Sequence, residues 1–245
     1  MKTLLLIVSL LLIHPMTNDK EKIQTDLPLK YLVHTSGSTK DRPLIIFLHG
    51  YGSNEEDLFA LRSELLPEYT YISIRAPIHL FGAGYQWFSL QPPAGGLAQV
   101  ARELSDSTKL LEDFIKAVAR KYETPAEKII LVGFSQGGIM SYELALKKPQ
   151  VVRAMAALGS MMLPTLQQQI TPGTNLYGLD VFIGHGVEDN RIPLSSALAT
   201  QQTLLKTSIK PEYHAYNGLG HSINNALMKD LHNWILKVVN TPRKI

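Results

Sequence analysis

The sequence predicts an α/β fold in which a mostly parallel central sheet is covered by helices on both faces. Strand-like and helix-like segments alternate after residue 28, the order that builds a parallel sheet with helical crossovers. Several strand-like segments are short and almost wholly apolar, as expected of strands buried on both sides. With 245 residues, the chain is long enough for one large domain with a substantial core.

The apolar runs and their flanking residues indicate the individual elements. The expected strands are residues 29–34, 44–48, 71–75, 129–132, 154–158, 181–185 and 212–216. The expected helices are residues 55–66, 100–121, 136–148, 194–206 and 223–239. Asn54, followed by three acidic residues, is a good N-cap for the first helix. Residues 81–99 form the longest irregular segment, and loops of this length are often binding loops; a surface loop without a role fits equally well.

The N-terminal segment has the plan of a secretory signal peptide. Lys2 precedes an apolar run from Leu4 to Ile13, and Pro15 and a polar stretch follow it. The run is short for a membrane span, and no small-x-small cleavage site follows it. We expect residues 1–22 to direct export to the periplasm or the extracellular space, with an uncleaved anchor or a buried strand as alternatives. Residues 23–245 are expected to form a single domain.

Composition excludes several classes of function. The chain has no cysteine, so disulfides, thiolate metal sites and a cysteine nucleophile are ruled out. Net charge is +3, but Lys and Arg are dispersed along the chain, which gives nucleic-acid binding little support. The eight histidines show no metal-ligand spacing such as His-Glu-x-x-His. We therefore expect neither a metal nor a cofactor.

The pentapeptide Gly-Phe-Ser-Gln-Gly at residues 133–137 marks a candidate nucleophile. A Gly-x-Ser-x-Gly motif by itself is a weak signal, because about one chain of this length in twelve contains it by chance. Here the motif follows the apolar run 129–132 and precedes a helix-compatible stretch, which is the strand-turn-helix setting of a nucleophile elbow. We predict that Ser135 is a nucleophile; an ordinary serine between two glycines is the alternative.

A serine nucleophile needs a general base that a carboxylate orients. Asp189 lies in the loop after the strand 181–185, and His221 lies in the glycine-rich loop after the strand 212–216. Both loops leave the carboxyl ends of predicted strands, where open α/β sheets place their sites. The base is predicted to be His221, with helix capping as its alternative role. The acid is predicted to be Asp189, with Glu188 as its neighbouring rival.

Two backbone N–H groups are candidates to bind the oxyanion of a tetrahedral intermediate. The N–H of Gln136 directly follows the nucleophile at a helix start, where free amides favour negative charge. The loop His-Gly-Tyr-Gly at residues 49–52 follows the strand 44–48, the expected place of the second donor. We predict the N–H groups of Tyr51 and Gln136 as donors, whereas His49 is expected only to shape the loop.

The chain resembles the phospholipase/carboxylesterase family of α/β-hydrolases, which includes acyl-protein thioesterases and small bacterial carboxylesterases. The matching pieces are "IIFLHGYGSNEEDLFAL", "SIRAP", "YQWFSL", "ILVGFSQGGIMSYELAL", "HGVEDNRIP" and "GLGHSI", which follow the family's order. The form "HGYGSNEEDLF" is more similar to the bacterial esterases than to the thioesterases. The resemblance implies an α/β-hydrolase fold without a large lid domain, the triad Ser135, Asp189 and His221, the donors Tyr51 and Gln136, and a place for Trp87 beside the site.

Together these features predict a serine carboxylesterase that hydrolyses short-to-medium acyl esters of small molecules through an acyl-enzyme. The expected substrate-binding residues are Trp87, Phe88 and Met161. Met162, Leu163 and Leu90 are further candidates for an apolar acyl pocket, but core packing explains at least half of the set Phe88, Leu90, Met161, Met162 and Leu163 better. No stable membrane span is expected after processing. The oligomeric state is open, with a homodimer as one option.

Several alternatives keep the same site or the same scaffold. One is an exported esterase that acts on polysaccharide, phenolic or polyester ester groups. Others are a lysophospholipase or acyl thioesterase, a serine peptidase, and a non-catalytic binding protein on a hydrolase scaffold. The intact Ser, Asp and His in the expected order argue against a binding protein.

Overall fold

The structure is a computed structural model that describes residues 21–80, 82–176 and 178–243. The predicted export segment, residues 1–22, therefore lies almost entirely outside the described residues. Within the described ranges, no helix is both long and apolar enough to span a membrane.

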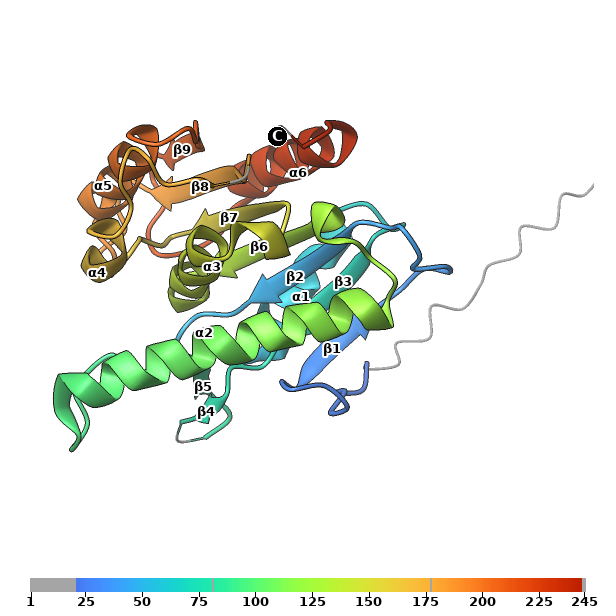
Figure 1. Ribbon diagram of the computed structural model, residues 1–245, viewed down its shortest axis with the longest axis horizontal. Coiled ribbons are helices and arrows are strands. Elements are labelled where there is room, and N and C mark those ends of the chain that lie inside the picture. The colour runs from blue at the N-terminus through green and yellow to red at the C-terminus, as the bar shows by residue number, and fades with distance from the viewer. Residues whose placement is uncertain (1–20, 81, 177, 244–245) are drawn as a thin grey trace, which may run out of the picture.

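A seven-stranded sheet forms the centre of the molecule (Figure 1). Its strands are β1 (Tyr31–His34), β2 (Leu44–Leu48), β3 (Thr70–Ile74), β6 (Ile129–Phe134), β7 (Ala154–Leu158), β8 (Asp180–Gly186) and β9 (Glu212–Tyr216). They lie in the order β1-β3-β2-β6-β7-β8-β9. β1 pairs antiparallel with β3, and the other neighbours are parallel. The mostly parallel sheet that the sequence predicts is confirmed.

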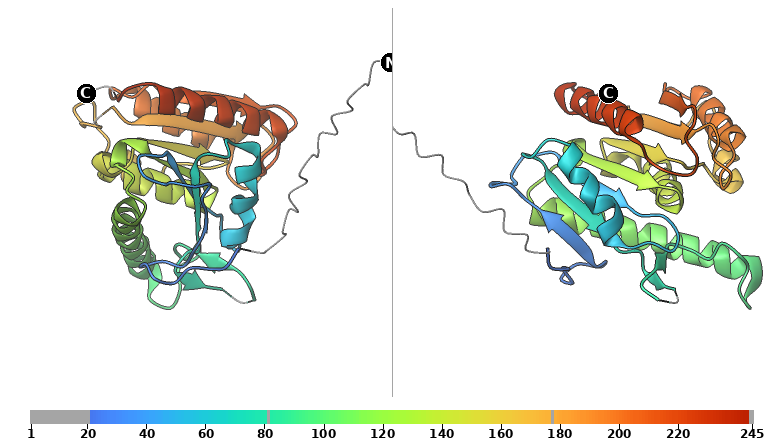
Figure 2. Two further views of the ribbon diagram at one scale, coloured as in Figure 1. Left: turned by 90° about the vertical axis from the view of Figure 1, so that its right-hand side faces the viewer. Right: turned by 180° about the vertical axis from the view of Figure 1, so that it is seen from behind.

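Helices cover both faces of this sheet (Figures 1 and 2). They are α1 (Glu55–Phe59), α2 (Gly96–Lys121), α3 (Gln136–Lys147), α4 (Pro164–Gln167), α5 (Leu194–Leu205) and α6 (Asn225–Asn240). Side chains from α2 to α5 join one apolar cluster, and side chains from α1 and α6 join the other. β2 shows why both faces are apolar: Ile46 packs into the first cluster, and Ile45 and Phe47 pack into the second.

All seven predicted strands are present, but some other elements differ from the prediction. The first predicted helix is split into α1 and a 3₁₀ segment, Ala60–Glu64, in which the Ser63 hydroxyl donates to the Ala60 carbonyl. α2 begins four residues early, at Gly96, and the Gln99 side chain accepts from the N–H of Gly95, which directly precedes the helix. Part of the segment predicted to be irregular is therefore helical.

Among the α-helices and strands of the described residues, three short ones have no counterpart in the prediction. They are α4 and the two strands of a small ribbon, β4 (Ile78–His79) and β5 (Tyr85–Gln86). Each ribbon strand has two residues, too few to show an alternating pattern. The ribbon depends on tertiary contacts instead, such as the paired hydrogen bonds between Tyr85 and the 52–53 segment.

A buried ion pair ties the beginning of α1 to the end of β3. The Arg75 guanidinium binds the Glu55 carboxylate with both ends, Nε to Oε2 at 2.6 Å and Nη2 to Oε1 at 2.5 Å. Burial by itself would raise the pKa of Glu55, but the hydrogen bonds from Arg75, a backbone hydrogen bond and the Arg75 charge together lower the pKa below its ordinary value. Arg75 also donates to the Tyr85 hydroxyl at 3.1 Å, which anchors the ribbon.

Candidate active site

Ser135 lies on a sharp turn between β6 and α3. Its backbone has φ +54° and ψ −118°, a conformation that a residue other than glycine rarely adopts and that costs free energy. Two contacts hold the turn: the Ser135 N–H donates to the Leu158 carbonyl at 2.9 Å, and the Ser160 hydroxyl donates to the Ser135 carbonyl at 2.7 Å. The strand-turn-helix setting predicted for Ser135 is therefore present, with the backbone strain typical of a nucleophile elbow.

The two glycines of the motif are required by close backbone packing. A Cβ added to Gly137 would lie 1.9 Å from the Leu48 carbonyl oxygen at the end of β2. A Cβ added to Gly133 would lie 2.3 Å from the Gly137 carbonyl oxygen. Real Cβ atoms almost never come within 3.0 Å of such atoms, so any side chain at either position would push β6, the turn and β2 apart.

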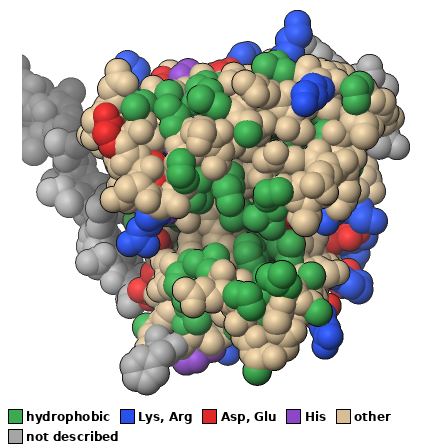
Figure 3. All heavy atoms as spheres, turned by 90° about the vertical axis from the view of Figure 1, so that its left-hand side faces the viewer, with side chains coloured by type: hydrophobic (Ala, Val, Ile, Leu, Met, Phe, Trp, Pro, Cys, Tyr) green, Lys and Arg blue, Asp and Glu red, His purple; other side chains and the backbone are tan. Residues whose placement is uncertain are grey.

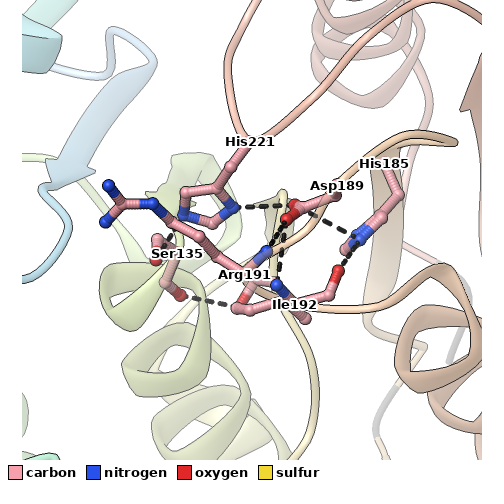
Figure 4. A network of polar contacts seen from close by, with 7 residues as sticks. Ser135, His185, Asp189, Arg191, Ile192 and His221 are labelled. Carbon is pink, nitrogen blue, oxygen red and sulfur yellow. Dashed lines mark hydrogen bonds and ion pairs between the residues drawn. The ribbon is translucent and has the colours of Figure 1, made fainter.

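The three residues of the predicted triad meet at this turn (Figure 4). The Nε2 atom of His221 lies 2.9 Å from the Ser135 hydroxyl oxygen, and its Nδ1 atom lies 2.7 Å from Oδ2 of Asp189. The Phe134 ring packs against the imidazole with ring centroids 4.9 Å apart. Since an ionised carboxylate can only accept, Nδ1 carries a proton and Nε2 is free to accept one from Ser135.

The loop after β8 holds the Asp189 carboxylate in place. Its Oδ1 atom accepts from the N–H groups of Arg191 and Ile192, each at 2.9 Å. Burial by itself would raise the pKa of Asp189, but the Ile192 N–H, the His221 imidazole and the Arg191 N–H together lower the pKa below its ordinary value. Asp189, rather than its rival Glu188, contacts the imidazole.

His185 supports this loop from behind, a position that the sequence did not reveal. It is fully buried at the end of β8, and its Nε2–H donates to the Ile192 carbonyl at 2.8 Å. The same nitrogen lies 3.5 Å from Oδ2 of Asp189. The signal in the sequence is a histidine four residues before the predicted acid.

The loop after β2 brings the second predicted oxyanion donor beside the elbow. A Cβ built on Gly50 would lie 3.3 Å from Cβ of Ser135, so the loop passes directly alongside the nucleophile. The N–H groups of Tyr51 and Gln136 donate to no other atom of the described chain. Both predicted donors are therefore unoccupied at the turn, as an oxyanion hole requires.

His49 shapes this loop, as expected. Its Nε2 atom accepts from the Ala76 N–H at 3.1 Å, and its Nδ1–H donates to the Gly50 carbonyl at 2.8 Å. The side chain is fully buried, and burial lowers its pKa, so the ring stays neutral. With both nitrogens engaged, His49 is a structural residue.

A cleft of about 540 Å³ opens above Ser135 and His221. Its apolar lining comes from Leu90, Phe134, Ile139, Met161 and Ile192. Figure 3 views the side toward which the sheet strands point in Figure 1, and hydrophobic side chains gather there around a hollow. The volume and lining are typical of a small-molecule site.

Some of the predicted pocket residues line the cleft, and others do not. Met161 and Leu90 line the cleft, whereas Trp87 and Phe88 are buried and are not among its lining residues. The Trp87 Nε1–H donates to the His49 carbonyl at 3.0 Å. Both large aromatic side chains pack in the core behind the donor loop, so the structure gives no support to substrate contact by Trp87 and Phe88, which stays a prediction. Met162 and Leu163 likewise pack in the core.

The buried side chain of Gln136 explains how this aromatic segment is held. Its Oε1 atom accepts from the Trp87 N–H at 2.9 Å, and its Nε2–H donates to the Phe88 carbonyl at 2.7 Å. The sequence predicts only a backbone role for Gln136. The structure adds a side-chain role, because this amide satisfies two buried backbone groups that would otherwise lack partners.

Comparisons with known proteins agree with this geometry. A probable carboxylesterase SOBER1-like of Arabidopsis thaliana is 25% identical over 208 residues, which cover 79% of this chain and 78% of the relative. Acyl-protein thioesterase 1 of Candida albicans is 27% identical over 215 residues, 80% of this chain and 91% of the relative. The crystal structure of a Bacillus cereus carboxylesterase superposes with a TM-score of 0.72 at 22% identity, over 86% of this chain and 94% of that one.

The family match extends over almost all of the folded chain. The phospholipase/carboxylesterase family matches residues 30–239, which include the elbow, the donor loop and the loops of Asp189 and His221. The sheet, its covering helices and the lack of a large lid within the described residues fit the α/β-hydrolase fold. The chain belongs to the phospholipase/carboxylesterase family of α/β-hydrolases and is a carboxylic ester hydrolase.

Proposed function

We propose that the protein is a serine carboxylesterase that hydrolyses small-molecule esters with short-to-medium acyl chains through a Ser135-His221-Asp189 triad. The observation that carries this proposal is the continuous pair of contacts from Ser135 Oγ through the imidazole to Asp189, at 2.9 and 2.7 Å. Ser135 and His221 line a cleft with a mostly apolar surface. No cofactor is needed, because the hydroxyl, the imidazole and water supply every reacting group.

In the first half of the reaction, Ser135 forms an acyl-enzyme. Its Oγ attacks the ester carbonyl carbon while Nε2 of His221 takes the hydroxyl proton. The carbonyl oxygen becomes an oxyanion, which the N–H groups of Tyr51 and Gln136 stabilise. The intermediate then collapses, the imidazolium gives its proton to the leaving alkoxide, and the alcohol departs. The ionised Asp189 keeps Nδ1 protonated throughout and stabilises the imidazolium.

In the second half, water releases the acid. His221 takes a proton from a water molecule, whose oxygen attacks the acyl carbonyl through a second oxyanion. Collapse returns the proton from the imidazolium to Ser135 and frees the carboxylic acid. The apolar lining of Leu90, Ile139 and Met161 suits an alkyl acyl chain, because its burial removes apolar surface from water.

A thioesterase is the second candidate, and the similarity to a fungal acyl-protein thioesterase favours it. The same acyl-enzyme serves both reactions, since only the leaving atom differs. Matched butyryl esters of an alcohol and of a thiol separate the candidates: a larger kcat/KM for the thioester, after correction for its intrinsic reactivity, would favour the thioesterase.

We also propose that the enzyme is exported, which the apolar leader at residues 4–13 supports. Cell fractionation of the full chain in a bacterial host measures this. Recovery of all activity in the cytosolic fraction would contradict export.

Replacement of the nucleophile tests the esterase itself. We expect Ser135→Ala to reduce kcat on p-nitrophenyl butyrate by about a millionfold and to abolish labelling by a fluorophosphonate, because attack then lacks its oxygen. The control is Ser105→Ala, an exposed serine on α2, which should keep both properties. Turnover by Ser135→Ala within a hundredfold of the unmodified enzyme, with the fold intact, would refute the assignment.

A further inference from the structure

Arg191 brings a positive charge into the cleft that ester hydrolysis itself does not use. It is exposed and lines the same cleft as Ser135 and His221. Figure 4 shows its side chain extending from the Asp189 loop toward the side on which Ser135 and His221 lie. Within the described residues, no carboxylate lies within ion-pair distance of its guanidinium. The charge is therefore available to a bound molecule.

The backbone of Arg191 is held in a fixed position relative to the reacting groups. The Arg191 N–H donates to the same Asp189 carboxylate that orients His221. The next residue, Ile192, makes the equivalent contact and is held in turn by His185. Because these contacts use only the backbone of residue 191, the guanidinium extends from a rigid loop and a change of side chain leaves the loop's bonds intact.

The surroundings strengthen the effect of this charge. The neighbouring lining is apolar, so water competes less effectively for an ion there than on an open surface. Asp57 is the acidic residue of the lining, and it accepts from the Ser53 hydroxyl at 2.7 Å. Asp57 lies on α1, which follows β2, whereas Arg191 follows β8, and β6 with its nucleophile lies between these strands. The two charges thus belong to opposite sides of the cleft.

We propose that Arg191 is a specificity-determining residue that binds an anionic group of the substrate, so that preferred substrates carry a carboxylate or similar oxyanion besides the scissile ester. The proposal rests on the esterase function argued above and names its substrate class. A guanidinium suits this task, because its planar fork donates two parallel hydrogen bonds to an oxyanion. Neutral esters still fit the apolar lining but forgo this contact.

The experiment compares anionic and neutral esters of matched size on the full-length protein. In the acyl arm, p-nitrophenyl hemiglutarate is paired with p-nitrophenyl valerate. In the alcohol arm, 4-acetoxybenzoate is paired with 4-acetoxybenzamide. The quantity measured is the ratio of kcat/KM for the anionic ester to that for the neutral ester, in the unmodified enzyme and in Arg191→Gln, Arg191→Lys and the control Arg120→Gln. Comparing variants cancels the intrinsic reactivity of each ester.

We expect Arg191→Gln to lower this ratio about tenfold in at least one arm, mainly through KM, because it removes one charge-assisted contact at a partly exposed site. The arm that responds identifies which half of the ester carries the anion. Arg191→Lys should retain part of the preference, and Arg120→Gln, an exposed arginine at the far end of α2, should retain all of it. Raising the salt concentration to about 0.5 M should reduce the preference of the unmodified enzyme.

Two outcomes overturn the proposal in distinguishable ways. If Arg191→Gln changes the ratio by less than about twofold in both arms while the unmodified enzyme hydrolyses the neutral esters, anion recognition fails and the esterase function stands. If the unmodified enzyme hydrolyses none of the four esters, both proposals fail together.

Discussion

Gly137 lies in the first turn of α3, where this helix passes under the end of β2. A methyl group at this position would lie 1.9 Å from the Leu48 carbonyl oxygen, 2.5 Å from its carbon and 2.7 Å from the His49 carbonyl oxygen. All three are backbone atoms, so no side chain can rotate away to make room. The Gly137→Ala variant must therefore move α3 and the end of β2 apart.

The size of the required movement sets the expected effect. The shortest contact must grow from 1.9 Å to at least 3.0 Å, a shift of roughly 1 Å in a close-packed core. Overpacking of this kind costs about 3 kcal/mol of folding free energy. The moved segment leads directly into the donor loop at Gly50 and Tyr51, and a misplacement of about 1 Å in a catalytic group can cost a hundredfold in rate.

We expect Gly137→Ala to lower the free energy of unfolding by about 3 kcal/mol in urea titrations and kcat/KM on p-nitrophenyl butyrate by at least about a hundredfold. The matched control is Gly173→Ala, since a Cβ at Gly173 would meet nothing within 4 Å. Its kcat/KM should be unchanged, and its free energy of unfolding should lie within about 0.5 kcal/mol of that of the unmodified enzyme. The reasoning is refuted if Gly137→Ala folds with the stability and activity of the control.

Two further predictions concern ionised groups. The lowered pKa of Asp189 keeps its carboxylate charged at pH 5 and above, so the pH profile of kcat/KM should show no ionisation of this acid between pH 5 and 8. Because His221 must be neutral to accept a proton, kcat/KM should not fall as pH rises over this range; a profile that falls, or that shows an acid ionising above pH 5, would contradict these roles. Glu55→Gln should lower the free energy of unfolding by about 2 to 4 kcal/mol at pH 7, because it leaves the Arg75 guanidinium without its buried partner. The control Glu64→Gln, at an exposed position, should leave the free energy of unfolding almost unchanged. The pKa of Glu55 is lower in the folded state than in the unfolded chain, so its stabilising contribution is present above the unfolded-state pKa and disappears as pH falls through the folded-state pKa. The difference in free energy of unfolding between Glu55→Gln and the unmodified enzyme, measured by urea unfolding, should therefore shrink below about pH 4. A difference that does not depend on pH would show that the ion pair is not its source.

The fold followed from the sequence wherever a segment was long enough to show its own pattern. The run Ile129 to Val132 is apolar throughout, and it forms the fully buried first part of strand β6. The ribbon of β4 and β5 could not be found this way, because two-residue strands carry no periodicity and depend on contacts with Arg75 and the 52–53 segment.

The candidate site, like the fold, was predictable from the sequence only in part. Ser135, Asp189 and His221 were predicted because each follows a recognisable strand, and parallel strands bring their carboxyl ends to one edge of the sheet. The burial of Trp87 was not predicted, since an aromatic residue in a loop has the same local pattern whether it faces the cleft or the core. Only its hydrogen bond to His49 and the amide clamp of Gln136 show which way it points.

The sequence by itself therefore determined the order of strands and helices, the elbow around Ser135 and the choice of Asp189 and His221 as proposed acid and base, because backbone periodicity and turn chemistry are local properties. Tertiary structure alone decided which side chains line the cleft, how His185 supports Asp189 and where the Arg191 charge extends. The cleft depends on the convergence of loops that lie between Gly50 and His221 along the chain. Such convergence arises only when the sheet assembles and its buried faces pack, so no local pattern can encode it.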